Sequence, residues 1–180
     1  MTETPAEVIA FWREAGPERW FEKDQAFDET VRARFLALHE RATDGELKHW
    51  EQSANGALAL MLLCDQFPRN MFRGTARAFA TDELARAIAA AALLKGFDAQ
   101  VPSDLRTFFY LPFEHSEDMA DQERGLALYA AAGDQDDLKW AQIHADVIRR
   151  FGRFPHRNAA LDRSTTPEEQ AFLDAGGFTG

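Results

Sequence analysis

The stretch Asn55-Gly56-Ala57-Leu58-Ala59-Leu60-Met61-Leu62-Leu63-Cys64-Asp65-Gln66-Phe67-Pro68 decides the fold of this chain of 180 residues. It is nearly all apolar up to Phe67, which is typical of a buried helix. Proline lacks the amide hydrogen and clashes with the preceding helical turn, so Pro68 is predicted to end that helix. The sequence therefore places a central buried helix over residues 55–67.

Helical periodicity continues on both sides of this run, because apolar residues recur at spacings of three and four. Longer helices are predicted at about 5–16, 24–43, 81–96, 116–132 and 136–151, with a short one from about 166. Shorter helical segments are predicted at about 45–50 and 103–112. No stretch shows sustained alternation with β-branched residues. The prediction is an all-α chain, a single domain over residues 1–180, with about seven to nine helices.

Several helix boundaries and one apolar stripe carry more specific predictions. Thr81 is expected to cap the helix that follows it, and Ser116 to cap the next long helix. Pro112 is expected to break the segment that contains Tyr110. In the helix over residues 136–151, an apolar stripe that includes Trp140 is predicted.

The composition predicts a packed aromatic core in a soluble, cytoplasmic protein. Hydrophobic residues make up 46% of the chain, which holds 15 Phe and 4 Trp. The net charge of −10 argues against nucleic-acid and membrane partners, since phosphate binding needs a basic face. The first residues lack the features of a signal peptide, and no apolar run approaches the length of a membrane span. The one cysteine, Cys64, is predicted to be a small buried hydrophobe.

Two short stretches nearly repeat each other: Gln66-Phe67-Pro68-Arg69-Asn70 and Arg153-Phe154-Pro155-His156-Arg157-Asn158. Each sets an aromatic residue, a proline, an arginine and an asparagine after a long apolar segment. Both are predicted to be rigid turns that break a helix and present cationic and amide groups to one shared pocket. The planar fork of arginine suits carboxylates and phosphates, so a local anion site is compatible with an acidic protein.

The first of these stretches supplies Asp65, Arg69, Asn70 and Arg73 as candidate ligand-binding residues. Arg69 and Arg73 are four residues apart and share a face if a helical turn resumes after the proline. One interpretation is an anion clamp beside Asp65. The alternative is a structural corner in which Asp65 pairs with an arginine, since buried ion pairs often serve folding.

A second group of candidates comprises Arg106, Tyr110, His115 and Glu117. Arg106 and Tyr110 are spaced for one helical face, while His115 and Glu117 fall at a predicted helix start. His115 with neighbouring carboxylates could form an acid/base pair or hold a divalent metal. A metal is the less favoured interpretation because further ligands at definite spacing are missing, so no cofactor is predicted.

A third group comprises His144, Arg153, His156, Arg157 and Asn158. His144 lies beside an apolar stripe and is expected to be at least half buried. It is either an interhelical hydrogen-bonding residue or, with His115, a candidate acid/base. The residues after Pro155 repeat the donor set of the first stretch and add an imidazole.

At these residues the chain resembles a bacterial family of uncharacterised proteins, the domain of unknown function 924 family. The resemblance rests on short sequence motifs. They are Phe11-Trp12, Trp20-Phe21, Lys23-Asp24 and the segments 63–75, 110–117, 121–123, 150–158 and 164–169. The resemblance implies an all-helical fold of the tetratricopeptide-like superhelical kind, and it implies no activity. The chain has no period of about 34 residues, as true tetratricopeptide repeats have.

Three functional hypotheses follow. The first is a pocket lined by Arg, His and Asn that binds a small carboxylate or phosphate, with His115 or His144 as acid/base. The second is a tetratricopeptide-like module with an exposed apolar groove for a protein partner. The third is a metal-assisted hydrolase that uses His115, Glu117 and His144.

Overall fold

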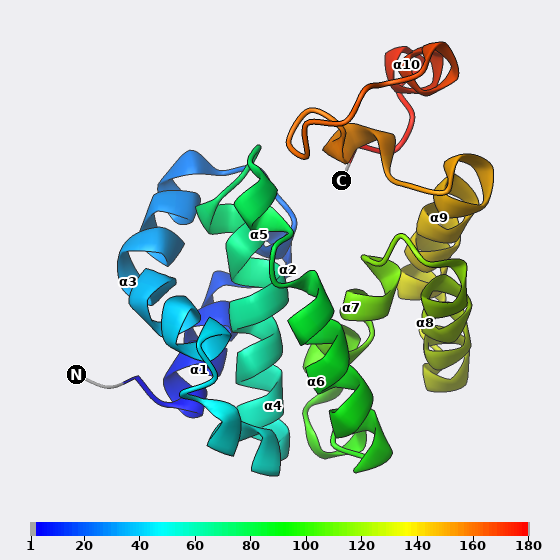
Figure 1. Cartoon of the computed structure of the whole chain (residues 1–180). Helices are drawn as coiled ribbons and strands as arrows, with labels where there is room; N and C mark the ends of the chain where they lie inside the picture. Colours follow the sequence, from blue (N-terminus) through cyan, green and yellow to red (C-terminus); the bar gives the residue numbers. More distant parts are fainter. Residues whose placement is uncertain (1–2, 180) are drawn as a thin grey trace. The chain divides into compact units, whose positions relative to one another are not determined.

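A computed structural model describes residues 3–179 of the chain, and every regular element among them is helical (Figure 1). The α-helices are α1 (Pro5–Ala15), α2 (Pro17–Trp20), α3 (Gln25–Thr43), α4 (Ala54–Met61), α5 (Phe67–Met71), α6 (Asp82–Leu94), α7 (Leu111–Glu114), α8 (Met119–Ala132), α9 (Gln135–Phe151) and α10 (Pro167–Asp174). Between them lie the 3-10 helices η1 (Lys48–Gln52), η3 (Ala76–Ala78), η4 (Asp98–Gln100), η5 (Ser103–Phe109) and η6 (Pro155–Arg157). The predicted all-α fold is confirmed.

Local capping signals set most helix starts where the sequence predicts them. Thr4 and Thr166 each form a capping box with a glutamate three residues later. Asp24 caps α3, and Asp134 caps α9 through its side-chain oxygen. Each of these side chains satisfies amide groups that the first helical turn leaves without a partner.

The described chain divides into two compact units, and each is treated by itself. Unit 1 is Met1–Arg73 with Arg77–Phe109, and it contains α1 to α6. Unit 2 is Gly74–Ala76 with Tyr110–Gly180, and it contains α7 to α10. The single-domain organisation expected from the sequence stays a prediction. Among the described residues, none of the helices combines the length and apolar composition needed to span a membrane.

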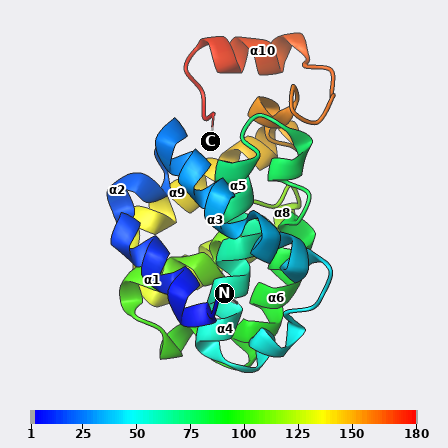
Figure 2. The same cartoon turned by 90° about the vertical axis from the view of Figure 1, so that its left-hand side faces the viewer.

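Unit 1 is built around α4, which packs against α1 on one side and α6 on the other (Figure 1). Its aromatic core lies between α1, α3 and α5. Figure 2 shows these three helices from another side. The rings of Phe35 and Phe67 lie 4.7 Å apart, and those of Trp12 and Phe67 lie 5.4 Å apart. Such aromatic pairs supply much of the apolar area that a core buries.

The central helix does not end at Pro68, so that prediction is wrong. After α4 the chain makes a π-helical turn, η2 (Leu62–Gln66), and continues directly into α5 with Pro68 near its start. The Phe67 amide donates to Leu62 O, five residues back. Proline is tolerated here because the first turn of a helix does not use its amide hydrogen, and π-turns occur as single insertions inside α-helices.

Side chains from elsewhere in unit 1 complete the hydrogen bonding of this π-turn. Leu63 O accepts a hydrogen bond from His39 Nδ1 at 2.9 Å, and Cys64 O accepts one from Thr81 Oγ1 at 2.6 Å. Buried carbonyl groups are costly when they lack a donor, so the two side chains stabilise the irregular turn. Thr81 therefore gives its hydroxyl to the π-turn, and the expected side-chain cap on α6 is absent.

The second near-repeat does form a turn, as the sequence predicts. Gly152 ends α9 in the left-handed conformation with φ of 69°. Phe154 is extended, and Pro155 starts the 3-10 turn η6. The two near-repeats therefore have different backbone structures, one helical and one a turn.

Two further boundaries differ from the prediction. Pro112 does not break a helix: it occupies the first turn of the short helix α7, and Tyr110 precedes that helix. The cap of α8 is Asp118, whose carboxylate accepts from the Ala120 amide. Ser116, the predicted cap, instead donates to Asp121.

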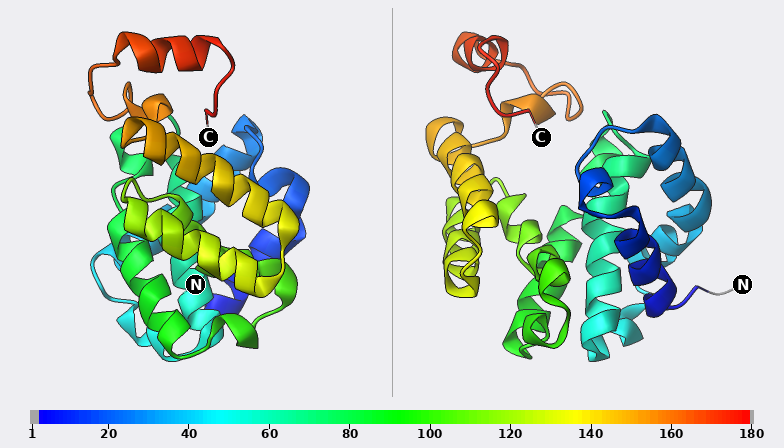
Figure 3. Two further views of the ribbon diagram at one scale, coloured as in Figure 1. Left: turned by 90° about the vertical axis from the view of Figure 1, so that its right-hand side faces the viewer. Right: turned by 180° about the vertical axis from the view of Figure 1, so that it is seen from behind.

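Unit 2 is centred on α8 and α9, which run side by side in opposite directions (Figure 3). Val147, Ile148 and Phe154 form its buried cluster, against which Phe172 and Phe178 pack. Trp140, which belongs to the apolar stripe predicted for α9, is exposed. His144 lies on the buried side instead, which brings a polar ring to the core of the unit.

Candidate functional site

A buried carboxylate and an imidazole meet in unit 2. Glu114 Oε1 lies 2.9 Å from His144 Nδ1, and the same nitrogen lies 2.9 Å from the carbonyl oxygen of Trp140. The Glu114 residue is 3% exposed and His144 is 8% exposed. Both neighbours of Nδ1 accept hydrogen bonds, so Nδ1 carries the proton and the neutral ring has its lone pair on Nε2.

The position of Glu114 is fixed by the residues around α7. Buried Gln122 of α8 donates its amide to Glu114 O at 2.6 Å and to Ser116 O at 2.7 Å. Gly125, one turn further along α8, faces the same segment: a Cβ there would lie 3.6 Å from Glu114 N and from Phe113 Cβ, an ordinary van der Waals distance. The two hydrogen bonds from Gln122 hold the end of α7 against α8, so the Glu114 backbone has a defined place.

Aromatic rings surround the imidazole of His144. Its ring centroid lies 4.3 Å from that of Phe178, 5.7 Å from Phe154 and 6.2 Å from His115. His156 lies 5.6 Å from Phe154 and 5.4 Å from Phe178. We call these three histidines and two phenylalanines the histidine cluster. It brings together His115, His144 and His156, all of which the sequence proposes as site residues.

A buried arginine lies against the same cluster. The guanidinium carbon of Arg157 is 4.4 Å from the centroid of the Phe154 ring, and the residue is buried. Arginine on an aromatic face is a favourable arrangement for a desolvated cation. The guanidinium of Arg157 and the carboxylate of Glu114 thus lie next to the three imidazoles and two phenyl rings of the histidine cluster.

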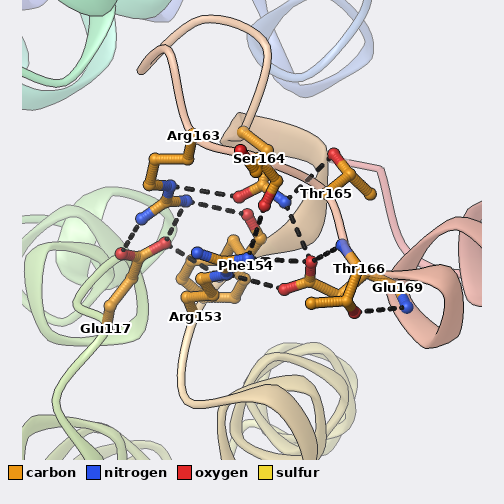
Figure 4. A network of polar contacts seen from close by, with 9 residues as sticks. Glu117, Arg153, Phe154, Arg163, Ser164, Thr165, Thr166 and Glu169 are labelled. Atoms are coloured by element: carbon orange, nitrogen blue, oxygen red, sulfur yellow. Dashed lines mark hydrogen bonds and ion pairs between the residues drawn. The ribbon is translucent and has the colours of Figure 1, made fainter.

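Glu117, another predicted site residue, holds the turn that carries this cluster (Figure 4). Its carboxylate accepts from the Phe154 amide at 2.8 Å and from Arg163 at 2.6 and 3.0 Å. Arg163 also donates to Phe154 O at 3.1 Å. Burial favours the neutral acid, but the hydrogen bonds from Arg163 and Phe154 outweigh it and lower the pKa of Glu117. Glu117 is therefore a positioning residue for Phe154.

Arg153 and Asn158 converge on a buried carboxylate, that of Glu169 in α10. Figure 4 shows Arg153 and Glu169 of this group. Arg153 donates to it at 2.6 and 2.9 Å, and Asn158 at 3.2 Å. The Thr166 amide donates to the same carboxylate at 2.8 Å. The Arg153 hydrogen bond is the main cause that lowers the pKa of Glu169 to about 2. These candidates therefore serve an ion pair inside unit 2.

The candidates in unit 1 also have carboxylate partners. Arg69 lies 3.2 Å from Asp65 and donates to both oxygens of Asp82 at 3.0 and 3.1 Å. The pairing of Asp65 with an arginine that the structural alternative predicts is present, but the chain continues as a helix there and forms no corner. Asp82 sits in the first turn of α6 and was not predicted to take part.

Asn70 and Arg73 share a different carboxylate, that of Asp28 in α3. Asn70 donates to it at 2.7 Å, and Arg73 donates at 2.7 and 2.9 Å. The bidentate geometry is typical of strong arginine–carboxylate pairs. No local sequence signal connects Asp28 with residues more than forty positions away.

Arg106 and Tyr110 do not share a helical face, because η5 is a 3-10 helix that ends before Tyr110. Arg106 donates to Asp98 O at 3.2 Å in unit 1. In unit 2, the Tyr110 ring packs edge-on against Tyr129, with centroids 5.2 Å apart. The spacing argument for this pair assumed an α-helix and is wrong.

The predicted site residues are thus divided between the two units. Unit 1 holds Asp65, Arg69, Asn70, Arg73 and Arg106, whereas unit 2 holds Tyr110, His115, Glu117, His144, Arg153, His156, Arg157 and Asn158. A single pocket shared by the two near-repeats stays a prediction. Within residues 3–179, no group of three or more His, Cys, Asp and Glu side chains has an arrangement that could hold a metal ion.

The fold and this cluster define an all-α protein with a buried histidine–carboxylate pair. The chain belongs to the family described as bacterial protein of unknown function (DUF924), whose family model matches residues 8–177. It is similar to the solved structure of a protein of unknown function, ATU0120 from Agrobacterium tumefaciens, with 50% sequence identity and a TM-score of 0.92. That likeness covers 96% of this chain and 97% of the other. No curated protein matches the chain. The predicted family is confirmed, and the tetratricopeptide-like architecture stays a prediction.

Proposed function

We propose that unit 2 binds a small anionic ligand, a carboxylate or a phosphate, at the histidine cluster, and that His144 exchanges a proton with it. The observation that carries the proposal is the 2.9 Å contact between buried Glu114 and His144 Nδ1. A buried carboxylate that orients an imidazole is an arrangement that acid/base sites use repeatedly.

The tautomer of His144 supports this role. Nδ1 donates toward Glu114 and Trp140, so Nε2 is the nitrogen with a lone pair in the neutral ring. A ligand proton can be taken up at Nε2, and the resulting imidazolium would be stabilised by the negative charge of Glu114 at Nδ1. Glu114 therefore acts as a positioning residue and His144 as the group that meets the ligand.

The surroundings of the ring favour an anion. Arg157 lies over the Phe154 ring on which His144 and His156 also pack, and His115 is the next ring beyond His144. These side chains supply N–H donors and one permanent positive charge within the cluster. A local anion site of this kind is compatible with the overall charge of −10 because short-range donors act over a few ångströms.

Thermal-shift and calorimetric titrations with inorganic phosphate, acetate and benzoate test the proposal. We expect at least one anion to bind saturably and to stabilise the wild type by about 2.7 kcal/mol at a hundredfold excess over Kd. His144→Gln is expected to abolish this binding, whereas His49→Gln, at an exposed histidine of unit 1, is expected to retain it. Binding that is equal in the wild type and in His144→Gln would contradict the proposal.

The other hypotheses from the sequence have less support. Among the described residues the exposed large hydrophobic side chains are Phe21 just after α2, Leu94 at the end of α6 and Trp140 in α9. No observation gives them a common apolar groove, so a protein-interaction module stays a prediction. The metal-assisted hydrolase also stays a prediction, as do the cytoplasmic location and the absence of a nucleic-acid partner.

A further inference from the structure

A surface depression lies beside the π-turn in unit 1. Its volume is about 400 Å³, and it is lined by the end of α3 and by residues just before α6. The lining side chains are His39, Glu40, Thr43, Asp44, Arg77, Ala80 and Thr81. We call it the π-turn depression. Its size falls in the range of small-molecule sites, about 300–1,000 Å³.

The hydrogen-bonding protons of its neutral polar side chains are all used inside the protein. His39 Nδ1 donates to Leu63 O at 2.9 Å, and Thr81 Oγ1 donates to Cys64 O at 2.6 Å. Thr43 Oγ1 donates to the His39 carbonyl oxygen at 2.9 Å. A neutral imidazole or a hydroxyl has one proton to give, so each group has only lone pairs left for a ligand.

His39 is the central acceptor of this set. The residue is 5% exposed and lines the depression, while its Nδ1 is turned to the π-turn. Its partner Leu63 O can only accept, which fixes the proton on Nδ1 and leaves Nε2 as a bare acceptor. Burial lowers the pKa of His39, so the ring stays neutral at physiological pH.

The charged side chains around the depression favour a cation. Glu40 and Asp44 contribute two carboxylates, and Arg77 contributes one guanidinium. Arg77 lies 4.0 Å from the centroid of the Phe72 ring and 3.5 Å from Glu40. The edge of the depression therefore already accommodates one planar cation between an aromatic face and a carboxylate.

We propose that the π-turn depression is a second ligand site, which binds a small organic cation with N–H donors, an alkylammonium or a guanidinium group. The cation would donate to His39 Nε2 and to the oxygens of Thr43 and Thr81, with Asp44 as its counter-ion. An anion would meet lone pairs and the carboxylate of Asp44, and the one guanidinium of the lining, that of Arg77, is paired with Glu40 at 3.5 Å. The site therefore discriminates against anions by charge. The ligand has the opposite charge to that proposed for unit 2, so the two proposals fail independently.

The backbone around the π-turn is the reason that these side chains have no proton left for a ligand. In a regular helix Leu63 O would accept from the Phe67 amide, and the Nδ1 proton of His39 would be available to a ligand. Cys64 O would face Pro68, which has no amide hydrogen, so it needs the Thr81 proton in either case. The irregular turn takes both protons and so fixes the polarity of the depression. π-turns inside helices are frequent at functional sites, which agrees with this role.

Imidazole NMR of the full chain, titrated with methylammonium, benzylammonium and methylguanidinium chlorides, tests the proposal. We expect a saturable shift of the His39 Nε2 resonance with at least one of the three cations. Potassium chloride at the same ionic strength and inorganic phosphate are expected to leave it unchanged. The exposed His49 provides an internal reference in the same spectrum.

Two variants separate recognition from folding. His39→Asn retains an N–H donor for Leu63 O but lacks the Nε2 acceptor. It is expected to raise the Kd of the cation that binds the wild type by about tenfold. Asp44→Asn changes an exposed side chain, so it leaves folding intact and is expected to weaken binding similarly. His49→Asn is the matched control and should retain the wild-type Kd. The proposal is overturned if none of the three cations shifts His39 saturably, or if Asp44→Asn binds as tightly as the wild type.

Discussion

Thr81 donates its hydroxyl hydrogen to the carbonyl oxygen of Cys64 at 2.6 Å, across a separation of 17 residues. In a regular helix this carbonyl would accept from the residue four positions later, which is Pro68 and has no amide hydrogen. The side chain of Thr81 therefore replaces the missing backbone donor. This relationship explains how a proline is accommodated where the buried π-turn of unit 1 continues into α5.

Replacing Thr81 with valine tests that explanation. The variant keeps the shape of the side chain but leaves Cys64 O buried without its donor, so we expect a loss of about 1–3 kcal/mol in the free energy of unfolding. Urea denaturation followed by circular dichroism measures it. Thr43→Val, which changes an exposed threonine, is the control and should shift stability by less than about 0.5 kcal/mol. Equal stability of Thr81→Val and the wild type would contradict the explanation.

Cys64 is expected to be chemically inert in the folded protein. Burial raises the pKa of its thiol to about 12, and the side chain is fully buried in the π-turn. The thiolate is the reactive form, so an aromatic disulfide reagent at pH 8 should leave the native protein unlabelled. The same reagent in 6 M guanidinium should release one equivalent of product per chain, since the sequence holds a single cysteine. Rapid labelling of the native protein would show that the π-turn opens readily.

The Glu169 carboxylate should make unit 2 sensitive to acid. Its pKa is lowered from 4.5 to about 2 in the folded state, chiefly by Arg153. On acidification the unfolded chain takes up this proton first, so the contribution is present above pH 4.5 and is lost as the pH falls toward 2. Glu169→Gln should remove this part of the pH dependence of stability, measured by urea titrations between pH 6 and pH 3.

Glu168→Gln is the matched control for that experiment. Glu168 is the adjacent residue of α10, is exposed, and pairs with Arg150 at 3.2 Å. Exposed pairs contribute little to stability, so the control should follow the wild-type acid curve. An identical acid curve for Glu169→Gln and the wild type would show that the pair with Arg153 has little effect on the pKa of Glu169.

Phe178 is expected to restrict access to His144. Its ring centroid lies 4.3 Å from that of the imidazole, and the preceding residue Gly177 packs its backbone against the Phe172 ring. Phe178→Ala should therefore increase the rate at which diethylpyrocarbonate modifies His144, followed by peptide mass spectrometry. The rate at exposed His49 should not change and serves as the internal reference. An unchanged rate at His144 would mean that Phe178 does not cover the ring.

The sequence allowed the fold class and most helix boundaries to be predicted because their signals are local. The capping box at Thr166 and the cap at Asp24 act within a single helical turn. The π-turn could not be predicted, since its donors His39 and Thr81 lie 24 and 17 residues from the carbonyl groups they satisfy. The local preference of Pro68 predicts the end of a helix. Tertiary hydrogen bonds from His39 and Thr81 stabilise the π-turn before it, so the chain continues as a helix.

The candidate site could be predicted only in part, because the sequence indicates its histidines locally but not their distant partners. His144 was recognisable from its place beside an apolar stripe, His115 from its place at a predicted helix start, and His156 from the second near-repeat. The histidine cluster contains all three. Glu114 was considered only as one of several carboxylates near His115, because its partner is 30 residues away in α9. The carboxylates of Asp28 and Asp82, which hold the candidate arginines of unit 1, had no local signal.

The most direct measurement of the central claim is the ¹⁵N spectrum of the His144 imidazole during a titration with inorganic phosphate, acetate and benzoate. In the ligand-free protein at pH 8 the proton should reside on Nδ1, held toward Glu114 and Trp140, and Glu114→Gln should change this resonance. Addition of at least one anion should shift Nε2 saturably. A proton on Nε2 in the free protein, or an Nε2 resonance that none of the three anions shifts, would contradict the proposed site.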